Sequence, residues 1–178
     1  MKLEEPASLA NSILASLHGD SISRVIYREL DYRTGTPAYL AGEHHSLDYG
    51  LELHLVSSRT VSFIWKWPVA YYLAVLEGDL SSEFRGAPAI WDVSSDPRWA
   101  ELLNKRIDRT GLQWFKSETM GGDFPLTAKI ELGPASVVYI SLGVAGEADD
   151  ELAVMFSDEV ARAHGRYFER SARTQHWG

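Results

Sequence analysis

The chain has 178 residues, with 17 basic and 25 acidic side chains, a formal net charge of −8, 45% apolar residues and no cysteine. Its apolar content is too high and its charge too mixed for a disordered chain, and its length suits one soluble globular domain. Without cysteine, disulfides, thiol nucleophiles, iron–sulfur clusters and cysteine-based zinc sites are excluded. No apolar run approaches the ~20 residues of a membrane helix, and Glu4 and Glu5 argue against a signal peptide. We therefore expect a cytoplasmic protein with no membrane partner.

The negative charge is concentrated in one part of the chain. Residues 130–161 contain seven acidic residues and no basic one, whereas the rest of the chain holds 18 acidic against 17 basic residues. Arginines then follow at positions 162, 166, 170 and 173, which indicate either a solvated helix face or a site for phosphate or an acidic partner. The local charge of each segment, rather than the net charge of the chain, therefore indicates where a charged partner would bind.

The first predicted element is a helix that ends at Gly19. Pro6 suits the first turn of a helix, and glycine is a common residue just past a helix end. Between them, apolar residues recur on one helical face: Leu9, Ile13, Leu14 and Leu17. Because so short a helix is marginal alone, its apolar face should pack on a sheet.

Strands are predicted in the rest of the first half. Residues 49–55 and 61–67 alternate apolar with polar side chains across a tight connection, which indicates a hairpin. Pro68 ends the second of these strands, and the glycines and proline of residues 33–48 predict a loop. The predicted strands are residues 22–32, 49–55, 61–67 and 71–77.

The second half repeats this mixture of helix and strand. Residues 78–95 are predicted to form a loop, after which Asp96 and Pro97 mark a helix start as cap and first turn. Trp99, Leu102 and Leu103 would form the apolar face of that helix. Further strands are predicted over residues 112–115, 126–132, 137–142 and 151–156. Ser157, followed by Asp158 and Glu159, begins a final helix.

These elements predict a single α+β domain over residues 1–165. Short successive connections favour antiparallel pairing, so we expect a mainly antiparallel meander sheet of about seven to eight strands with about three helices packed on it. Residues 166–178 would form a basic C-terminal tail or an extension of the final helix, depending on whether Gly165 ends it.

An acidic cluster near residue 150 is the first candidate site. Its carboxylates lack the spacing of an EF-hand calcium loop, so a solvated hairpin loop is the simplest interpretation. A charged loop of this kind also attracts basic proteins, and we name it as the partner-binding candidate. Its residues are Glu147, Asp149, Asp150 and Glu151.

An aromatic group around Pro68 is the second candidate. Trp65, Trp67 and Tyr71 suit either a packed core or the wall of a ligand pocket, to which Glu29, Glu52 and His54 could add polar groups. Nucleic acid is not expected as a partner, because only one lysine accompanies these aromatic residues and the domain is acidic.

The sequence gives no case for a metal, a cofactor or a named reaction. His44, His45 and His54 match no zinc pattern, and the nucleophile-elbow, P-loop and dinucleotide-binding motifs are absent. Glu29 and Asp31, two residues apart, form only a nonspecific carboxylate pair. We therefore predict no metal site and no cofactor, and leave open whether the protein is an enzyme.

The leading hypothesis is a non-catalytic protein-interaction domain of bacterial type. In general character, a compact, acidic, cysteine-free domain resembles the small immunity proteins with which bacteria neutralise toxic, often basic nucleases. The resemblance implies a basic protein partner bound through the acidic cluster. One alternative is an enzyme or small-molecule binder that uses the aromatic pocket, and another is a subunit of a homo-oligomer.

Overall fold

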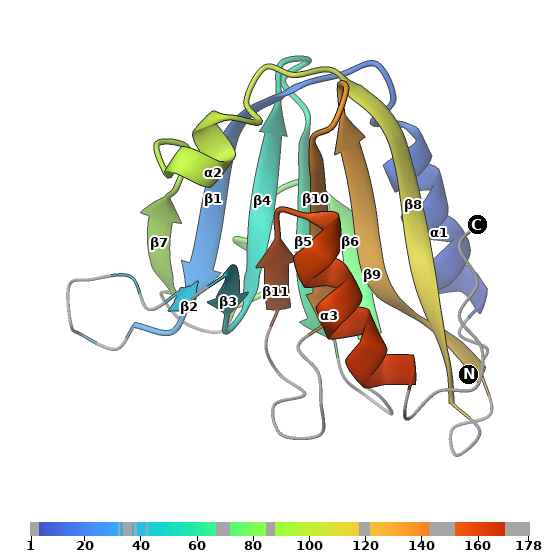
Figure 1. Cartoon of the computed structure of the whole chain (residues 1–178). Coiled ribbons are helices and arrows are strands. Elements are labelled where there is room, and N and C mark those ends of the chain that lie inside the picture. The colour runs from blue at the N-terminus through green and yellow to red at the C-terminus, as the bar shows by residue number, and fades with distance from the viewer. Residues whose placement is uncertain are drawn as a thin grey trace.

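The structure is a computed structural model in which two antiparallel sheets face each other (Figure 1). The residues it describes are 4–31, 33, 37, 39–41, 43–66, 72–84, 88–117, 122–142 and 152–169. The five-stranded sheet runs in the order β6 (Tyr72–Glu77), β5 (Thr60–Lys66), β4 (Gly50–Leu55), β1 (Ile22–Glu29) and β7 (Ala89–Asp92). The six-stranded sheet runs in the order β2 (Leu40–Ala41), β3 (His44–Leu47), β11 (Leu152–Met155), β10 (Val137–Leu142), β9 (Gly122–Leu132) and β8 (Ile107–Ser117).

The α+β class and the mainly antiparallel pairing are confirmed, but the prediction of a single meander sheet is wrong. The chain leaves the five-stranded sheet after β1 to form β2 and β3 of the other sheet, and returns to it for β4 to β7, with β7 pairing with β1. It later places β11 beside β3. Two sheets form because each has one apolar face, and packing these two faces together buries both of them away from water.

Two predicted loops contain short strands. Residues 33–48 include β2 and β3, and residues 78–95 include β7. The β3 sequence, His-His-Ser-Leu, and the β7 sequence, Ala-Ile-Trp-Asp, are too short and too mixed to show a clear alternation. Their strand conformation comes from pairing with β11 and β1, which lie far from them in the sequence.

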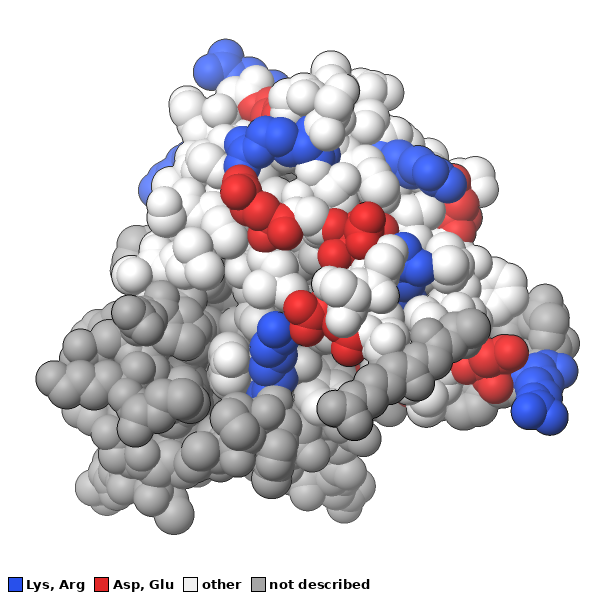
Figure 2. All heavy atoms as spheres, turned by 180° about the vertical axis from the view of Figure 1, so that it is seen from behind, with Lys and Arg blue, Asp and Glu red and all other residues white. Residues whose placement is uncertain are grey.

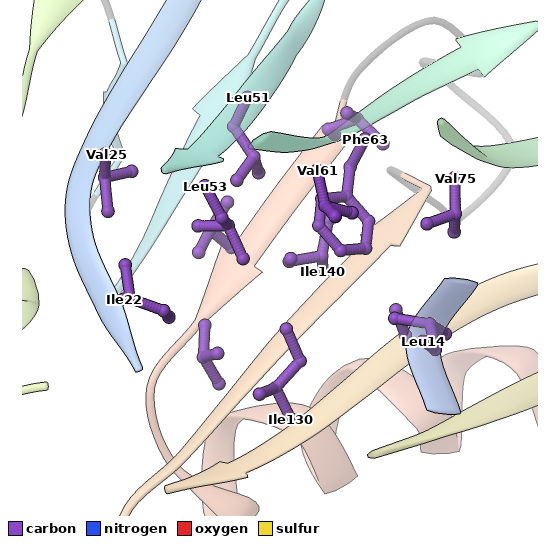
Figure 3. Close-up of a cluster of buried hydrophobic side chains, with 14 of the residues drawn as sticks. Leu14, Ile22, Val25, Leu51, Leu53, Val61, Phe63, Val75, Ile130 and Ile140 are labelled. Carbon is purple, nitrogen blue, oxygen red and sulfur yellow. The ribbon is translucent and has the colours of Figure 1, made fainter. Parts of the chain in front are cut away.

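The core lies between the inner faces of the two sheets. Figure 3 shows side chains of opposite sheets, such as Leu53 and Ile140, in one cluster together with Leu14 of the first helix. Alternate residues of the central strands supply most of it, in keeping with the period of two along a strand. These include Leu51, Leu53 and Leu55 of β4, Val61 and Phe63 of β5, and Val138, Ile140 and Leu142 of β10.

Three helices complete the described part of the fold. The helix α1 (Glu4–Ala15) lies against the edge strands β6 and β8, and α3 (Asp158–Glu169) covers the outer face of the six-stranded sheet (Figure 1). Ser157 caps α3 as predicted, because its Oγ accepts the Val160 N–H at 3.2 Å. The helix continues through Gly165 to its end at Glu169.

The second helix is shorter than its predicted apolar face suggests. Asp96 caps α2 (Pro97–Ala100) as expected, with its Oδ1 accepting the Arg98 N–H at 3.0 Å. After Ala100 the chain turns toward β8, and Leu102 lies in this turn. Asn104, in the same connection, has a φ of 60°, which lies in the left-handed region and not in that of a continuing α-helix. Among the described helices, none has both the length and the apolar character needed to cross a membrane.

Candidate functional sites

The acidic candidate residues Glu147, Asp149, Asp150 and Glu151 lie outside the described residues. The strands on either side of them are described. In the antiparallel pair of β10 and β11, Leu142 is the register partner of Leu152. The acidic connection therefore starts and finishes at neighbouring positions in the middle of the six-stranded sheet.

Among the described members of the proposed pocket, Trp65 and Glu29 lie on the other face of the sheet from Glu52 and His54. Trp65 lies on the inner face of β5, where it packs half-buried against the main core. Its Nε1 donates to the Asp48 carbonyl at 2.7 Å. Glu52 and His54 lie on the outer face of the same sheet. Glu29 lies on the inner face of β1, the face that also carries Tyr27. Trp67 and Tyr71 lie outside the described residues.

The three histidines considered as metal ligands are also separated. His45 is fully buried between the sheets, its neighbour His44 points to the other face of β3, and His54 lies on the outer face of β4. Within the described ranges, no group of three or more histidine, aspartate or glutamate side chains has the geometry of a metal site.

A buried ion cluster does form on the outer face of the five-stranded sheet, around Glu52. We call Arg28, Glu52, His54 and Thr60 the Glu52 cluster. Glu52 Oε1 accepts from Arg28 Nε and lies 2.8 Å from Arg28 Nη2, and the side chains are only 2% and 11% exposed. The register of β1 against β4 places Arg28 and Glu52 on adjacent strands, with both side chains on the outer face of the sheet.

His54 lies between two neighbours within this cluster. Its Nε2 lies 3.4 Å from Glu52 Oε2, and its Nδ1 lies 3.2 Å from Thr60 Oγ1. Both ring nitrogens face neighbours in the protein, which leaves neither one open to a metal ion. The buried ion pair of Arg28 and Glu52 forms the centre of the cluster.

A loop segment covers the Glu52 cluster. Residues 78–84, which we call the strap, cross the outer face, and the Leu80 N–H donates to Glu52 Oε1 at 2.9 Å. Leu80 is fully buried against Ile64 and Ala74. The sequence named Glu52 and His54 as polar pocket residues, but it did not indicate the strap or the role of Arg28, because residues 78–84 have the composition of a polar loop.

A second buried network, not found from the sequence, joins the two sheets. Trp99 Nε1 donates to Tyr27 Oη at 2.6 Å, and the same oxygen lies 2.8 Å from His45 Nδ1. On the far side of the ring, His45 Nε2 lies 3.7 Å from Asp96 Oδ2. Since the indole can only donate, the Tyr27 hydroxyl is free to donate to Nδ1, which leaves the ring proton on Nε2 facing Asp96.

The electrostatics of this network disfavour catalysis by Tyr27. Burial is the largest cause that raises the pKa of the Tyr27 hydroxyl well above its usual value, which is the opposite of what activates a nucleophile. Burial also lowers the pKa of His45 to about 4, although Asp96 acts in the other direction. The ring is therefore neutral at pH 7 and serves as a hydrogen-bond acceptor in the core.

The His45 environment predicts a specific loss of stability in acid. The pKa of His45 is about 4 in the folded protein and about 6.5 in an unfolded chain, so the unfolded state takes up the proton first. This contribution is fully present above pH 6.5 and is lost as the pH falls toward 4. We expect the unfolding free energy of the wild type, relative to His45→Gln, to fall by about 3 kcal/mol across that window.

Urea titrations of both proteins at several pH values measure this difference. The effect of carboxylate titration on the unfolding free energy is common to both proteins and drops out of the difference. An unfolding free-energy difference that stays constant between pH 6.5 and 4 would contradict the assignment of His45 as a neutral core residue.

Charged side chains on the described surface are largely balanced in pairs. Figure 2, which views the side opposite to α3, shows basic and acidic residues next to each other rather than gathered by sign. Ion pairs within the described residues include Arg24–Asp92, Arg59–Glu77, Lys66–Glu83, Lys129–Glu131 and Arg162–Asp158. Neither sign dominates this face.

Fold and sites together define a two-sheet α+β protein with antiparallel strands, a buried ion cluster under a strap, and a buried tyrosine–histidine network that links the sheets. Comparisons with protein-family models, curated proteins and solved structures gave no match.

Proposed function

We propose that the protein is a non-catalytic protein-interaction domain that binds a basic protein through the acidic connection between β10 and β11. The observation that carries the proposal is the uneven distribution of charge. Residues 143–151 contribute four carboxylates and no basic residue, whereas acidic side chains on the described surface commonly have a basic neighbour.

The position of this connection in the fold supports the proposal. Both of its ends belong to strands inside the six-stranded sheet, with β10 paired to β9 and β11 paired to β3. A connection whose ends are fixed on a rigid scaffold is a common location for binding residues. Concentrated negative charge then steers a basic partner toward it and weakens with added salt.

The kind of partner follows from the same charge. A cytoplasmic immunity-type protein that neutralises a basic toxin is the specific form of the proposal, in keeping with the acidic, cysteine-free composition. The buried Tyr27–His45 network favours a binding role over a catalytic one, because burial raises the pKa of the Tyr27 hydroxyl and so opposes its use as a nucleophile.

Charge reversal tests the proposal. Immobilised wild type and the double variant Asp149→Lys, Asp150→Lys are used to capture proteins from a bacterial lysate, and the basic proteins retained are quantified by mass spectrometry. We expect the variant to retain at least about tenfold less of the basic proteins that the wild type binds, because attraction becomes repulsion. The same proteins should elute from the wild type as salt rises.

A matched control carries the same change in net charge at another place. Glu43 and Glu101 are both exposed in turns of the described surface, and neither belongs to the acidic connection, so Glu43→Lys, Glu101→Lys makes an equal change in net charge. Unchanged capture by the Asp149→Lys, Asp150→Lys variant, or an equal loss in the control, would contradict the proposal.

A further inference from the structure

The strap is attached to the protein by very few apolar contacts. Of residues 78–84, Leu80 is fully buried and Phe84 is half-buried, while the other residues of the strap are exposed. Phe84 contacts the Tyr49 ring, with centroids 4.8 Å apart. With only Leu80 and Phe84 packed against the protein, the strap buries little apolar surface, and such a segment can open without unfolding of the whole protein.

The seat of Leu80 is a notch in the sheet that depends on a glycine. A Cβ added to Gly50 would lie 3.1 Å from Leu80 Cδ1 and 2.3 Å from the Phe63 carbonyl oxygen. The absence of a side chain at Gly50 therefore lets Leu80 approach the backbone of β4 closely. Ile64 and Ala74, with Tyr72 and Leu76 packed beside them, form the other apolar contacts of this small cluster.

Polar contacts hold the strap at its start, its middle and its end. The Ser62 hydroxyl donates to the Gly78 carbonyl at 2.5 Å, Glu52 Oε1 accepts the Leu80 N–H, and Lys66 Nζ lies 3.0 Å from Glu83 Oε2. Gly78, with a φ of 96°, makes the turn that directs the chain from β6 into the strap. The central contact is with a carboxylate that is already bound to Arg28, so strap and ion cluster share one acceptor.

We propose that the strap is a latch that opens as a local unit while both sheets stay folded, and that the Glu52 carboxylate holds it closed. Opening lifts Leu80 out of the notch and uncovers the apolar surface of Ile64 and Ala74 beside the Glu52 cluster. The device thereby switches the outer face of the five-stranded sheet between a covered and an uncovered form.

Amide hydrogen exchange in low concentrations of urea tests the latch. In the wild type, the amides of Leu80 and Glu83, which are hydrogen-bonded to Glu52 and to the Leu80 carbonyl, should exchange with little dependence on urea. Amides of the central strands β5 and β10 should exchange through urea-dependent global unfolding. Replacement of the carboxylate in Glu52→Gln should speed Leu80 exchange by about tenfold or more beyond any change in β5 and β10, since hydrogen bonds to charged acceptors are the stronger ones.

Two further variants keep the test decisive. Glu77→Gln removes an exposed carboxylate one residue before the strap and should leave Leu80 exchange unchanged. Leu80→Ala removes the apolar anchor, and strap amides should lose protection while β5 and β10 keep theirs, even if Glu52→Gln does not fold. The latch is overturned if strap and core amides share one opening free energy in the wild type, or if Leu80→Ala lowers protection equally in both.

Discussion

Substitution of Glu52 by alanine is expected to lower the unfolding free energy by about 3 to 5 kcal/mol, the typical cost of removing one partner of a buried ion pair. The loss leaves the Arg28 guanidinium without its carboxylate at a position where it is only 11% exposed. It also removes the acceptor of the Leu80 N–H. Urea unfolding followed by far-UV circular dichroism measures the effect.

Two comparisons identify the cause of this loss. Glu77→Ala breaks an exposed pair with Arg59, for which we expect less than about 1 kcal/mol. The double variant Arg28→Met, Glu52→Leu replaces both charges by apolar side chains of similar volume and should recover much of the stability that Glu52→Ala loses. If Glu52→Ala and Glu77→Ala lose the same unfolding free energy, the buried pair of Arg28 and Glu52 stabilises the protein no more than an exposed pair does.

Substitution of Trp99 by alanine should have an effect of similar size, about 3 to 5 kcal/mol. Trp99 is fully buried, packs edge-on against Phe156 with centroids 5.2 Å apart, and donates the hydrogen bond that fixes the Tyr27 hydroxyl. Its removal leaves a cavity where the single-turn helix α2 meets both sheets. The unfolding free energy in urea, again by circular dichroism, checks the prediction.

Trp91 on the edge strand β7 provides the matched control. It is half-buried and packs at the margin of the same core, so Trp91→Ala should cost clearly less than Trp99→Ala. Equal losses for the two tryptophans would mean that Trp99 is not the anchor of α2 in the core.

The sequence was sufficient where the fold is local. The hairpin predicted over residues 49–55 and 61–67 corresponds to β4 and β5, because alternation marks both strands and the connection between them is tight. The caps at Asp96 and Ser157 were found for the same reason, since a cap and the N–H groups it accepts lie within three residues.

Long-range contacts explain most of what was missed. Alternation shows which side of a strand is apolar, but it does not show which distant surface covers that side. Tyr27, His45 and Trp99 come from three separate segments, so no spacing in the sequence indicates that they share hydrogen bonds. Glu52 and His54 were named as candidate polar groups, but the strap that covers them depends on Leu80, an apolar residue in a mostly polar segment.

The location of α1 has a consequence for how copies of this chain behave toward one another. Thr110 Oγ1 of β8 donates to the Leu14 carbonyl at 2.9 Å, and Arg59 Nη1, just before β5, donates to the Ser16 carbonyl at 3.2 Å. The helix thus lies across β6 and β8, the last strands of their respective sheets. Because an open strand edge is a template for pairing with another molecule, we expect α1 to hinder such pairing at β6 and β8, two of the four edge strands of the described sheets.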